Sequence, residues 1–204
     1  MRAARWAFVL CCAGAATPLA HAQDAASLRA RYGALDGRLV SAEYQRPLYL
    51  ESTMRPDALS GDIYALFDQP FAIVGPSLKD LDHWCDILIL HLNVKGCRVA
   101  TSRAGKALRV NVGRKFDQPL ADTYLFEFQY ARESQPDYVQ VDLTAPEGPI
   151  GTSNYRIILE VVAIDPAHSF IHLSYSYDYA LPARVAMRGY LATIGRGKVG
   201  FSVV

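Results

Sequence analysis

Six strand-like segments separated by very short turns fill the second half of the chain, and this pattern constrains the fold more than any other feature. A parallel pair of strands needs a crossover of a dozen or more residues, which these turns are too short to supply. The pattern therefore predicts an antiparallel meander. The segments are Lys95–Ser102, Ala107–Phe116, Thr123–Arg132, Tyr138–Thr144, Asn154–Ile164 and Ser169–Leu181.

Outside the meander, the sequence predicts one more strand and three helices. The strand is Leu48–Met54, and residues 23–47 before it form an arm or a short helix. A first helix is expected to begin at Pro56-Asp57 and to stop at Pro70, because its apolar residues repeat at helical spacing. The last helix is expected over Ala183–Ile194.

The middle helix is expected to begin after Pro76. Ser77 and Asp80 are the acceptors that would satisfy free amides at its start. Its apolar face is formed by Leu78, Leu81, Trp84, Cys85 and Leu88. The order of elements predicts an α+β fold, in which helices pack on one side of a curled antiparallel sheet of six to seven strands.

Residues 1–22 have the three parts of a cleavable secretory signal. Arg2 and Arg5 give a positive start, residues 6–16 are apolar or small, and Ala20-His21-Ala22 suits a signal peptidase. The apolar run of roughly eleven residues is shorter than the ~20 that a spanning helix needs, which disfavours a membrane anchor. We therefore expect cleavage after Ala22 and a periplasmic or secreted protein.

Removal of this signal leaves a nearly neutral domain. The full chain has 21 basic and 20 acidic residues, and the signal contains two arginines and no acid. The mature chain then has 19 basic and 20 acidic residues, a net charge of −1. Such a charge gives no electrostatic reason to bind nucleic acid.

Two cysteines, Cys85 and Cys97, lie in the mature chain. In an oxidising compartment a disulfide between them is the simplest expectation, and closing so short a loop contributes roughly 2–3 kcal/mol. A metal site needs more ligands than this pair, so neither a metal nor a cofactor is expected. Cys11 and Cys12 do not follow a small residue, which disfavours a lipid-acceptor role for them.

Aromatic residues gather on one side of two predicted strands, because side chains alternate along a strand with period two. Tyrosine is informative here, since a buried hydroxyl needs a partner that an amphipathic ligand can supply. Two interpretations remain open: a plain core that faces helices, or a ligand-binding pocket. The predicted ligand-binding residues are Tyr124, Phe126, Phe128, Tyr130, Tyr175, Tyr177 and Tyr179.

Catalytic candidates are weaker. Asp86, His91 and His172 are the groups to test, but spacing brings no nucleophile, base and orienting residue together. The sequence has no phosphate loop, nucleophile elbow or dinucleotide fingerprint. We therefore favour a binding protein over an enzyme.

A locally basic stretch is interpreted mainly as solvated strand edges. The minor interpretation is peripheral contact with anionic lipid head groups. Its residues are Lys95, Arg98, Arg103, Lys106, Arg109, Arg114 and Lys115.

The order of elements resembles the START-like helix-grip superfamily, also called SRPBCC, which includes polyketide cyclases and lipid-transfer proteins. Trp84–Lys95 looks like its second helix running into a strand, and Tyr155–Tyr190 looks like its last strands and the approach to its closing helix. The resemblance covers Leu48 to Gly195 and implies a hydrophobic or amphipathic ligand, such as a lipid, held between the sheet and the closing helix. A minority of members are cyclases or hydratases.

The chain departs from that family at its end. The predicted helix is short and is followed by the apolar run Phe201-Ser-Val-Val204. Two expectations follow: either an insertion has been added, with the final run tucked in as a strand, or the closing helix lies beyond residue 204. With these alternatives the domain is assigned to residues 48–204. An envelope assembly or interaction protein without a ligand is the third functional hypothesis, beside a carrier and an enzyme.

Overall fold

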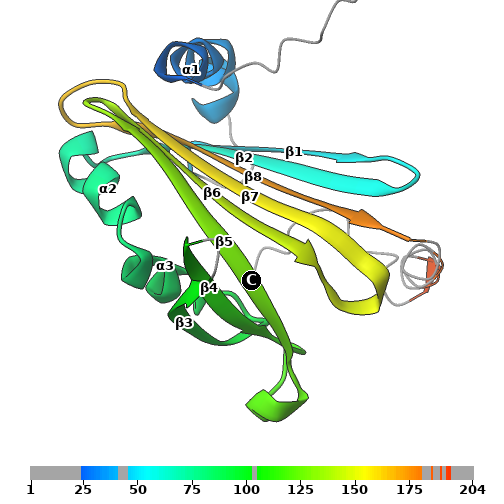
Figure 1. Ribbon diagram of the computed structural model, residues 1–204. Coiled ribbons are helices and arrows are strands. Elements are labelled where there is room, and N and C mark those ends of the chain that lie inside the picture. Colours follow the sequence, from blue (N-terminus) through cyan, green and yellow to red (C-terminus); the bar gives the residue numbers. More distant parts are fainter. Residues whose placement is uncertain are drawn as a thin grey trace, which may run out of the picture.

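One antiparallel sheet dominates the computed structural model (Figure 1). The structure describes residues 24–40, 46–102 and 105–180, together with Val185, Gly189, Ala192 and Thr193. Eight strands lie in the order β1-β2-β8-β7-β6-β5-β4-β3. They are β1 Leu48–Met54, β2 Ala58–Phe67, β3 Val94–Ser102, β4 Gly105–Val112, β5 Tyr124–Gln135, β6 Tyr138–Glu147, β7 Thr152–Ala163 and β8 Ser169–Tyr179.

The predicted meander is confirmed, since β3 to β8 match the six expected segments closely and pair as antiparallel neighbours. The α+β class is confirmed as well, with one or two more strands in the sheet than expected. The difference arises from Ala58–Phe67, which the sequence assigned to a helix.

Strand β2 corrects that assignment. It pairs along its whole length with β8, from Ala58 opposite Asp178 to Phe67 opposite Ser169, and it also pairs with β1. Leu59 and Ile63 are four residues apart, and this spacing returns to the same face in a strand as well as in a helix. The segment forms a strand rather than a helix because it has a partner strand on each side, β1 and β8.

Three helices cover the two faces of the sheet: α1 Ala25–Val40, α2 Phe71–Leu78 and α3 Leu81–Leu88. Figure 1 shows α1 on one side and α2 and α3 on the other. We call the face under α1 the outer face and the face under α2 and α3 the inner face. The arm before residue 48 is thus helical over Ala25–Val40.

The start of the middle helix is also corrected. Pro76 and Ser77 lie within α2, and Ser77 Oγ donates to the carbonyl oxygen of Ile73 at 3.0 Å. Asp80 caps α3 instead, because its side chain accepts the amide of Asp82 at 3.0 Å. The predicted apolar face is nevertheless the one that packs inward, with Leu78, Leu81 and Trp84 buried.

The predicted disulfide is confirmed. Cys85 in α3 is bonded to Cys97 in β3, with their Cα atoms 5.2 Å apart. It joins the helix that packs on the inner face to the edge strand of the sheet. No helix in the described ranges is long and apolar enough to cross a bilayer.

Several predictions lie largely or wholly outside the described residues. These are the signal peptide, the final run up to Val204 and most of the helix predicted over Ala183–Ile194. Within that last range, Val185, Gly189 and Ala192 are helical.

Candidate functional site

An unbroken row of aromatic rings crosses the inner face. Phe126 in β5 lies 4.9 Å, centroid to centroid, from Tyr124 and 5.2 Å from Phe128. Tyr155 in β7 continues the row, 4.9 Å from Phe126 and 5.1 Å from Tyr177 in β8. The two aromatic faces predicted from the sequence therefore converge, and Tyr155, which the prediction missed, is the ring that joins them.

The row continues along β8. Tyr177 lies 5.7 Å from Tyr175 and 6.2 Å from Tyr179. Phe126, Phe128 and Tyr155 are buried in the main core, whereas Tyr175 is 37% exposed. The row thus runs from packed core beside α2 and α3 to a more open aromatic surface on β8.

Hydroxyl partners separate these tyrosines into two groups. Tyr130, Tyr155 and Tyr179 donate to Lys79 O, Thr152 Oγ1 and Arg55 O at 3.0, 2.8 and 2.6 Å. Within the described part of the chain, the hydroxyls of Tyr124, Tyr175 and Tyr177 make no hydrogen bond. The first group therefore has a structural role, while the second can contact a ligand.

Burial raises the pKa of Tyr175 and Tyr177 above the ordinary tyrosine value. Both side chains are therefore neutral phenols across the physiological range. A neutral phenol can donate one hydrogen bond and accept others, and its ring packs on apolar groups. This part of the inner face is suited to an amphipathic molecule.

The outer face has a different character, because a buried ionic network lies under α1. His172 Nδ1 lies 2.8 Å from Glu160 Oε2, and His172 Nε2 lies 2.9 Å from Asp62 Oδ1. Tyr138 donates to Glu160 Oε1 at 2.6 Å. The four residues come from β2, β8, β7 and β6, so the network ties four adjacent strands together.

Both ring nitrogens of His172 face carboxylate oxygens, and the imidazolium form satisfies both contacts. Burial lowers the pKa of His172, but the hydrogen bonds to Asp62 and Glu160 outweigh it and raise the pKa above 6.5. The hydrogen bond from His172 lowers the pKa of Asp62. The network is therefore a closed ion cluster with no free ring nitrogen to act as a base.

Helix α1 covers this network. Its Leu28, Leu35 and Leu39 pack in a second core cluster with Tyr64 and Phe170. The Tyr64 ring stacks on His172 at 4.4 Å between centroids. The Arg31 guanidinium lies 4.7 Å from the centroid of the Tyr64 ring and also pairs with Glu51 at 2.5 Å.

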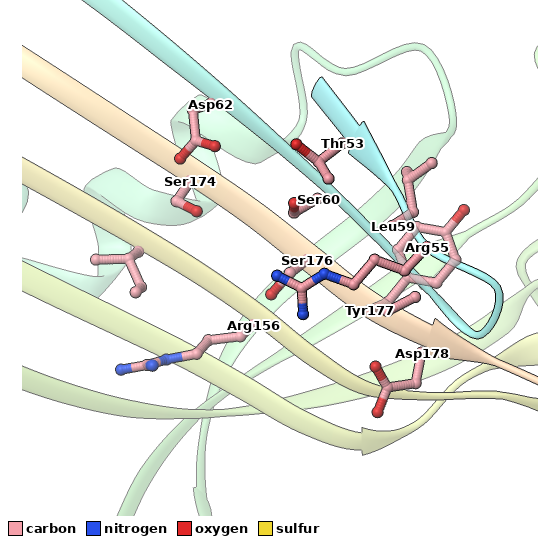
Figure 2. A pocket seen from close by; sticks show the side chains of 12 residues that line it. Thr53, Arg55, Leu59, Ser60, Asp62, Arg156, Ser174, Ser176, Tyr177 and Asp178 are labelled. Atoms are coloured by element: carbon pink, nitrogen blue, oxygen red, sulfur yellow. The ribbon is translucent and has the colours of Figure 1, made fainter. Parts of the chain in front are cut away.

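Beyond α1, the outer face opens into a polar groove of about 350 Å³. Figure 2 shows Asp62 and Asp178 toward its two ends and Arg55 reaching over it toward Ser176. Thr53, Ser60, Ser176 and Arg156 line it from four adjacent strands in one register row. Leu59, Ile158 and Tyr177 line it as well, so the groove has some apolar wall beside the polar groups, which can hold a small polar molecule.

The catalytic candidates lie apart from one another. Asp86 is exposed on α3, and His91 is exposed after it, where its Nδ1 accepts the amide of Asn93 at 3.2 Å. Neither the hydrogen bonds nor the ion pairs of the described residues join Asp86 to His91. His172 lies on the polar side of its strand as expected, but its partners are Glu160 and Asp62.

Glu160 and Asp62 were not among the site residues predicted from the sequence, for different reasons. Asp62 lay in the segment assigned to a helix. Glu160 is the only acid in the apolar segment Tyr155–Ala163, and the turn at Asp165–His168 places it opposite His172. The register of this hairpin could therefore have predicted the contact between Glu160 and His172.

Comparison with known proteins gives no match to a protein-family model and none to a curated protein. Solved structures do match. One is a START superfamily protein from Mycobacterium smegmatis, at 14% identity over 70% of this chain and 97% of that chain, with a TM-score of 0.43. Another is truncated norcoclaurine synthase from Thalictrum flavum, at 13% identity over 71% and 90%, with a TM-score of 0.43.

A third is an aromatase/cyclase from Streptomyces sp. R1128, at 13% identity over 67% of this chain and 73% of that chain, with a TM-score of 0.39. Similarities at this level concern the arrangement of sheet and helices, and the function proposed below rests on this chain's own residues. The sequence predicted a START-like arrangement, and the first of these structures is described as a START superfamily protein.

Proposed function

We propose that this chain is an exported binding or carrier protein for an amphipathic, lipid-like ligand. The ligand lies against the inner face, between the sheet and the helix predicted over Ala183–Ile194. The observation that carries the proposal is the aromatic row, which includes two tyrosines of β8, Tyr175 and Tyr177, whose hydroxyls make no hydrogen bond among the described residues. Apolar rings with a few placed polar groups are the usual lining of small-molecule sites.

The ligand that fits this surface has an extended apolar part and a hydrogen-bonding group. Its apolar part would pack on the rings of Tyr155 and Tyr177. Its polar group would form a hydrogen bond with the hydroxyl of Tyr175, which is the more exposed part of the row. Because the tyrosines are neutral, a carbonyl or hydroxyl group would be accepted without a charge partner.

The alternative of an enzyme of the same fold has no comparable observation in its favour. His172 is the most buried of the candidate acid–base groups, and its two nitrogens are engaged with Glu160 and Asp62. We therefore assign His172 to the stability of the outer face. An assembly factor without a ligand stays the third hypothesis. Extraction and dye binding distinguish it from a carrier, because such a factor would hold no small molecule.

The test is to purify the exported chain without detergent, extract it with organic solvent and identify small molecules by mass spectrometry. The extracted protein is then titrated with an anilinonaphthalene sulfonate dye. We expect a co-purified amphipathic molecule that competes with the dye. An extract with no such molecule, together with no dye binding by the folded protein, would refute the proposal.

The polar part of the proposal is tested by Tyr175→Phe with Tyr177→Phe. This pair keeps both rings and removes both hydroxyls, so the co-purified molecule should bind roughly tenfold more weakly, the value of about one hydrogen bond. The matched control is Ser174→Ala with Ser176→Ala, on the same strand and the opposite face. Export is tested separately, by N-terminal sequencing of the secreted chain, which should begin at Gln23.

A further inference from the structure

A set of bare apolar side chains lies at the end of α3 and in the connection to β3. Leu90 is 80% exposed and Leu92 is 64% exposed, and Ile87 and Ile89 are about half exposed. Single exposed apolar residues are common, but four within six positions are not, and such patches mark interaction sites. Figure 1 shows the segment on the inner-face side of the sheet, where α3 leads into β3.

A second loop with bare apolar side chains adjoins the first. The β4–β5 connection carries Phe116, 79% exposed, and Leu120, 54% exposed. Asn93 ties the two loops together, because its carbonyl accepts the Gly113 amide at 2.7 Å and its side chain donates to the Gly113 carbonyl at 2.8 Å. We call these two segments, residues 87–92 and 114–120, the apolar loop pair.

The loop pair is held in place rather than loosely attached. Cys85, immediately before it, is bonded to Cys97 in β3. The inward side of α3 is apolar, because Leu81 and Trp84 are buried in the core that contains Phe126 and Phe128. Helix α3 is thus apolar toward the inner face and leads directly into a second apolar surface that faces solvent. The exposed side of α3 itself carries the polar residues Asp82, His83 and Asp86, so the apolar surface begins only in the last turn of the helix, at Ile87.

Basic side chains flank the loop pair. Arg114 and Lys115 are exposed directly before Phe116, and Lys95 donates from Nζ to the carbonyl oxygen of Leu92 at 3.0 Å. Asp86, Asp117 and Asp122 are exposed in the same region, so the electrostatic attraction to an anionic surface is small and the apolar side chains dominate. Protruding aliphatic tips with lysine and arginine beside them fit the interface of a bilayer, where tails bury the tips and head groups meet the cations.

We infer that the apolar loop pair docks this protein on the interface of a lipid bilayer. Docking would place α3 between the bilayer and the packed end of the aromatic row at Phe126 and Phe128. This inference deepens the proposed function by naming the surface from which a lipid-like ligand would be reached. It does not depend on the ligand's identity, so the two are tested separately.

The test is flotation of the delipidated chain with vesicles of phosphatidylcholine, with or without phosphatidylglycerol. We expect the chain to float with both, and the gain from the anionic lipid to be small. Leu90→Asp with Leu92→Asp should reduce partitioning on the order of tenfold or more, because two exposed apolar side chains no longer enter the interface. Met54→Asp with Ile150→Asp is the matched control, since these side chains are 66% and 73% exposed elsewhere.

A second readout uses Leu90→Trp, whose emission should shift to the blue when the vesicles are added. The inference is overturned if the parent chain floats with neither vesicle, or if the Leu90/Leu92 and Met54/Ile150 pairs float equally. It is also overturned if light scattering finds a dimer that the Leu90/Leu92 pair converts to a monomer, since the loops would then be a subunit interface. Failure here with a ligand still found by extraction would leave the proposed function standing.

Discussion

The two faces of the sheet are built from the same strands, but their polar groups differ: those of the outer face are paired with one another, and some of those on the inner face are not. On the outer face of β8, His172 is buried and closed between two carboxylates. On the inner face of β8, Tyr175 and Tyr177 keep their hydroxyls without a partner among the described residues. Polar groups that satisfy one another stabilise a fold, whereas polar groups left open in an apolar surface can bind something else. Alternation along one strand therefore separates stability from binding.

The largest expected effect is on the outer face. Glu160→Ala should lower the free energy of unfolding by about 3–5 kcal/mol, because it leaves His172 with one carboxylate in a buried site. Chemical denaturation monitored by circular dichroism measures this. Arg156→Ala is the control on the same strand; its exposed pair with Asp142 should contribute only about 0–1 kcal/mol. An equal loss of unfolding free energy in the two variants would show that the buried network contributes no more than an exposed ion pair.

Removal of the disulfide should have the next largest effect. Cys85→Ser with Cys97→Ser should cost about 2–3 kcal/mol, because the unfolded chain regains the entropy of a short open loop. The same denaturation experiment measures the loss, with reduction of the parent protein as a second route to it. A loss below about 1 kcal/mol would show that α3 is held on the inner face by its apolar contacts alone.

The pH dependence of stability should follow from the pKa shifts of His172 and Asp62. The raised pKa of His172 gives a contribution that is complete below pH 6.5 and is lost as the pH rises through the folded-state pKa. The lowered pKa of Asp62 gives a contribution present above pH 3.8 and lost as the pH falls through its folded-state value. Nuclear magnetic resonance titration of His172 should therefore give a pKa above 6.5, and Asp62→Asn should lower it. A parent value at or below 6.5 would contradict the closed ion cluster.

A smaller effect is expected where α1 meets the outer face. Arg31→Ala should cost about 0.5–1 kcal/mol, since it removes a half-exposed ion pair with Glu51 and a cation–π contact with Tyr64. Arg31→Lys should recover part of this loss. If Arg31→Ala instead lowers the free energy of unfolding as much as Glu160→Ala does, α1 and the ionic network unfold as one cooperative unit.

The sequence predicted the inner face better than the outer face, for a physical reason. Alternation along β5 and β8 places the tyrosines on one side, and that information is local to each strand. The outer network depends on which strands are neighbours, because Asp62, His172 and Glu160 come from three of them. Short turns predict hairpin neighbours such as β7 and β8, so the contact between Glu160 and His172 was predictable from the register.

The contact between Asp62 and His172 was not predictable in the same way. It needs β2 beside β8, and over a hundred residues separate these two side chains. Local apolar spacing over Ala58–Phe67 is compatible with a helix as well as a strand, and only the tertiary partner decides. The cap of α3 shows the same limit on a smaller scale, since Ser77 and Asp80 are both good acceptors, and in the structure Ser77 lies inside α2 while Asp80 caps α3.

The central claim is that the inner face binds the ligand and the outer face does not. Its most direct test is dye affinity, measured by fluorescence titration on two double variants of β8 that both keep a native circular dichroism spectrum. Tyr175→Ala with Tyr177→Ala should weaken binding roughly tenfold or more, because ring packing is lost together with the hydroxyls. Ser174→Ala with Ser176→Ala should leave it unchanged. Unchanged binding in the tyrosine pair, or weakened binding in the serine pair alone, would contradict the claim and move the site to the outer groove.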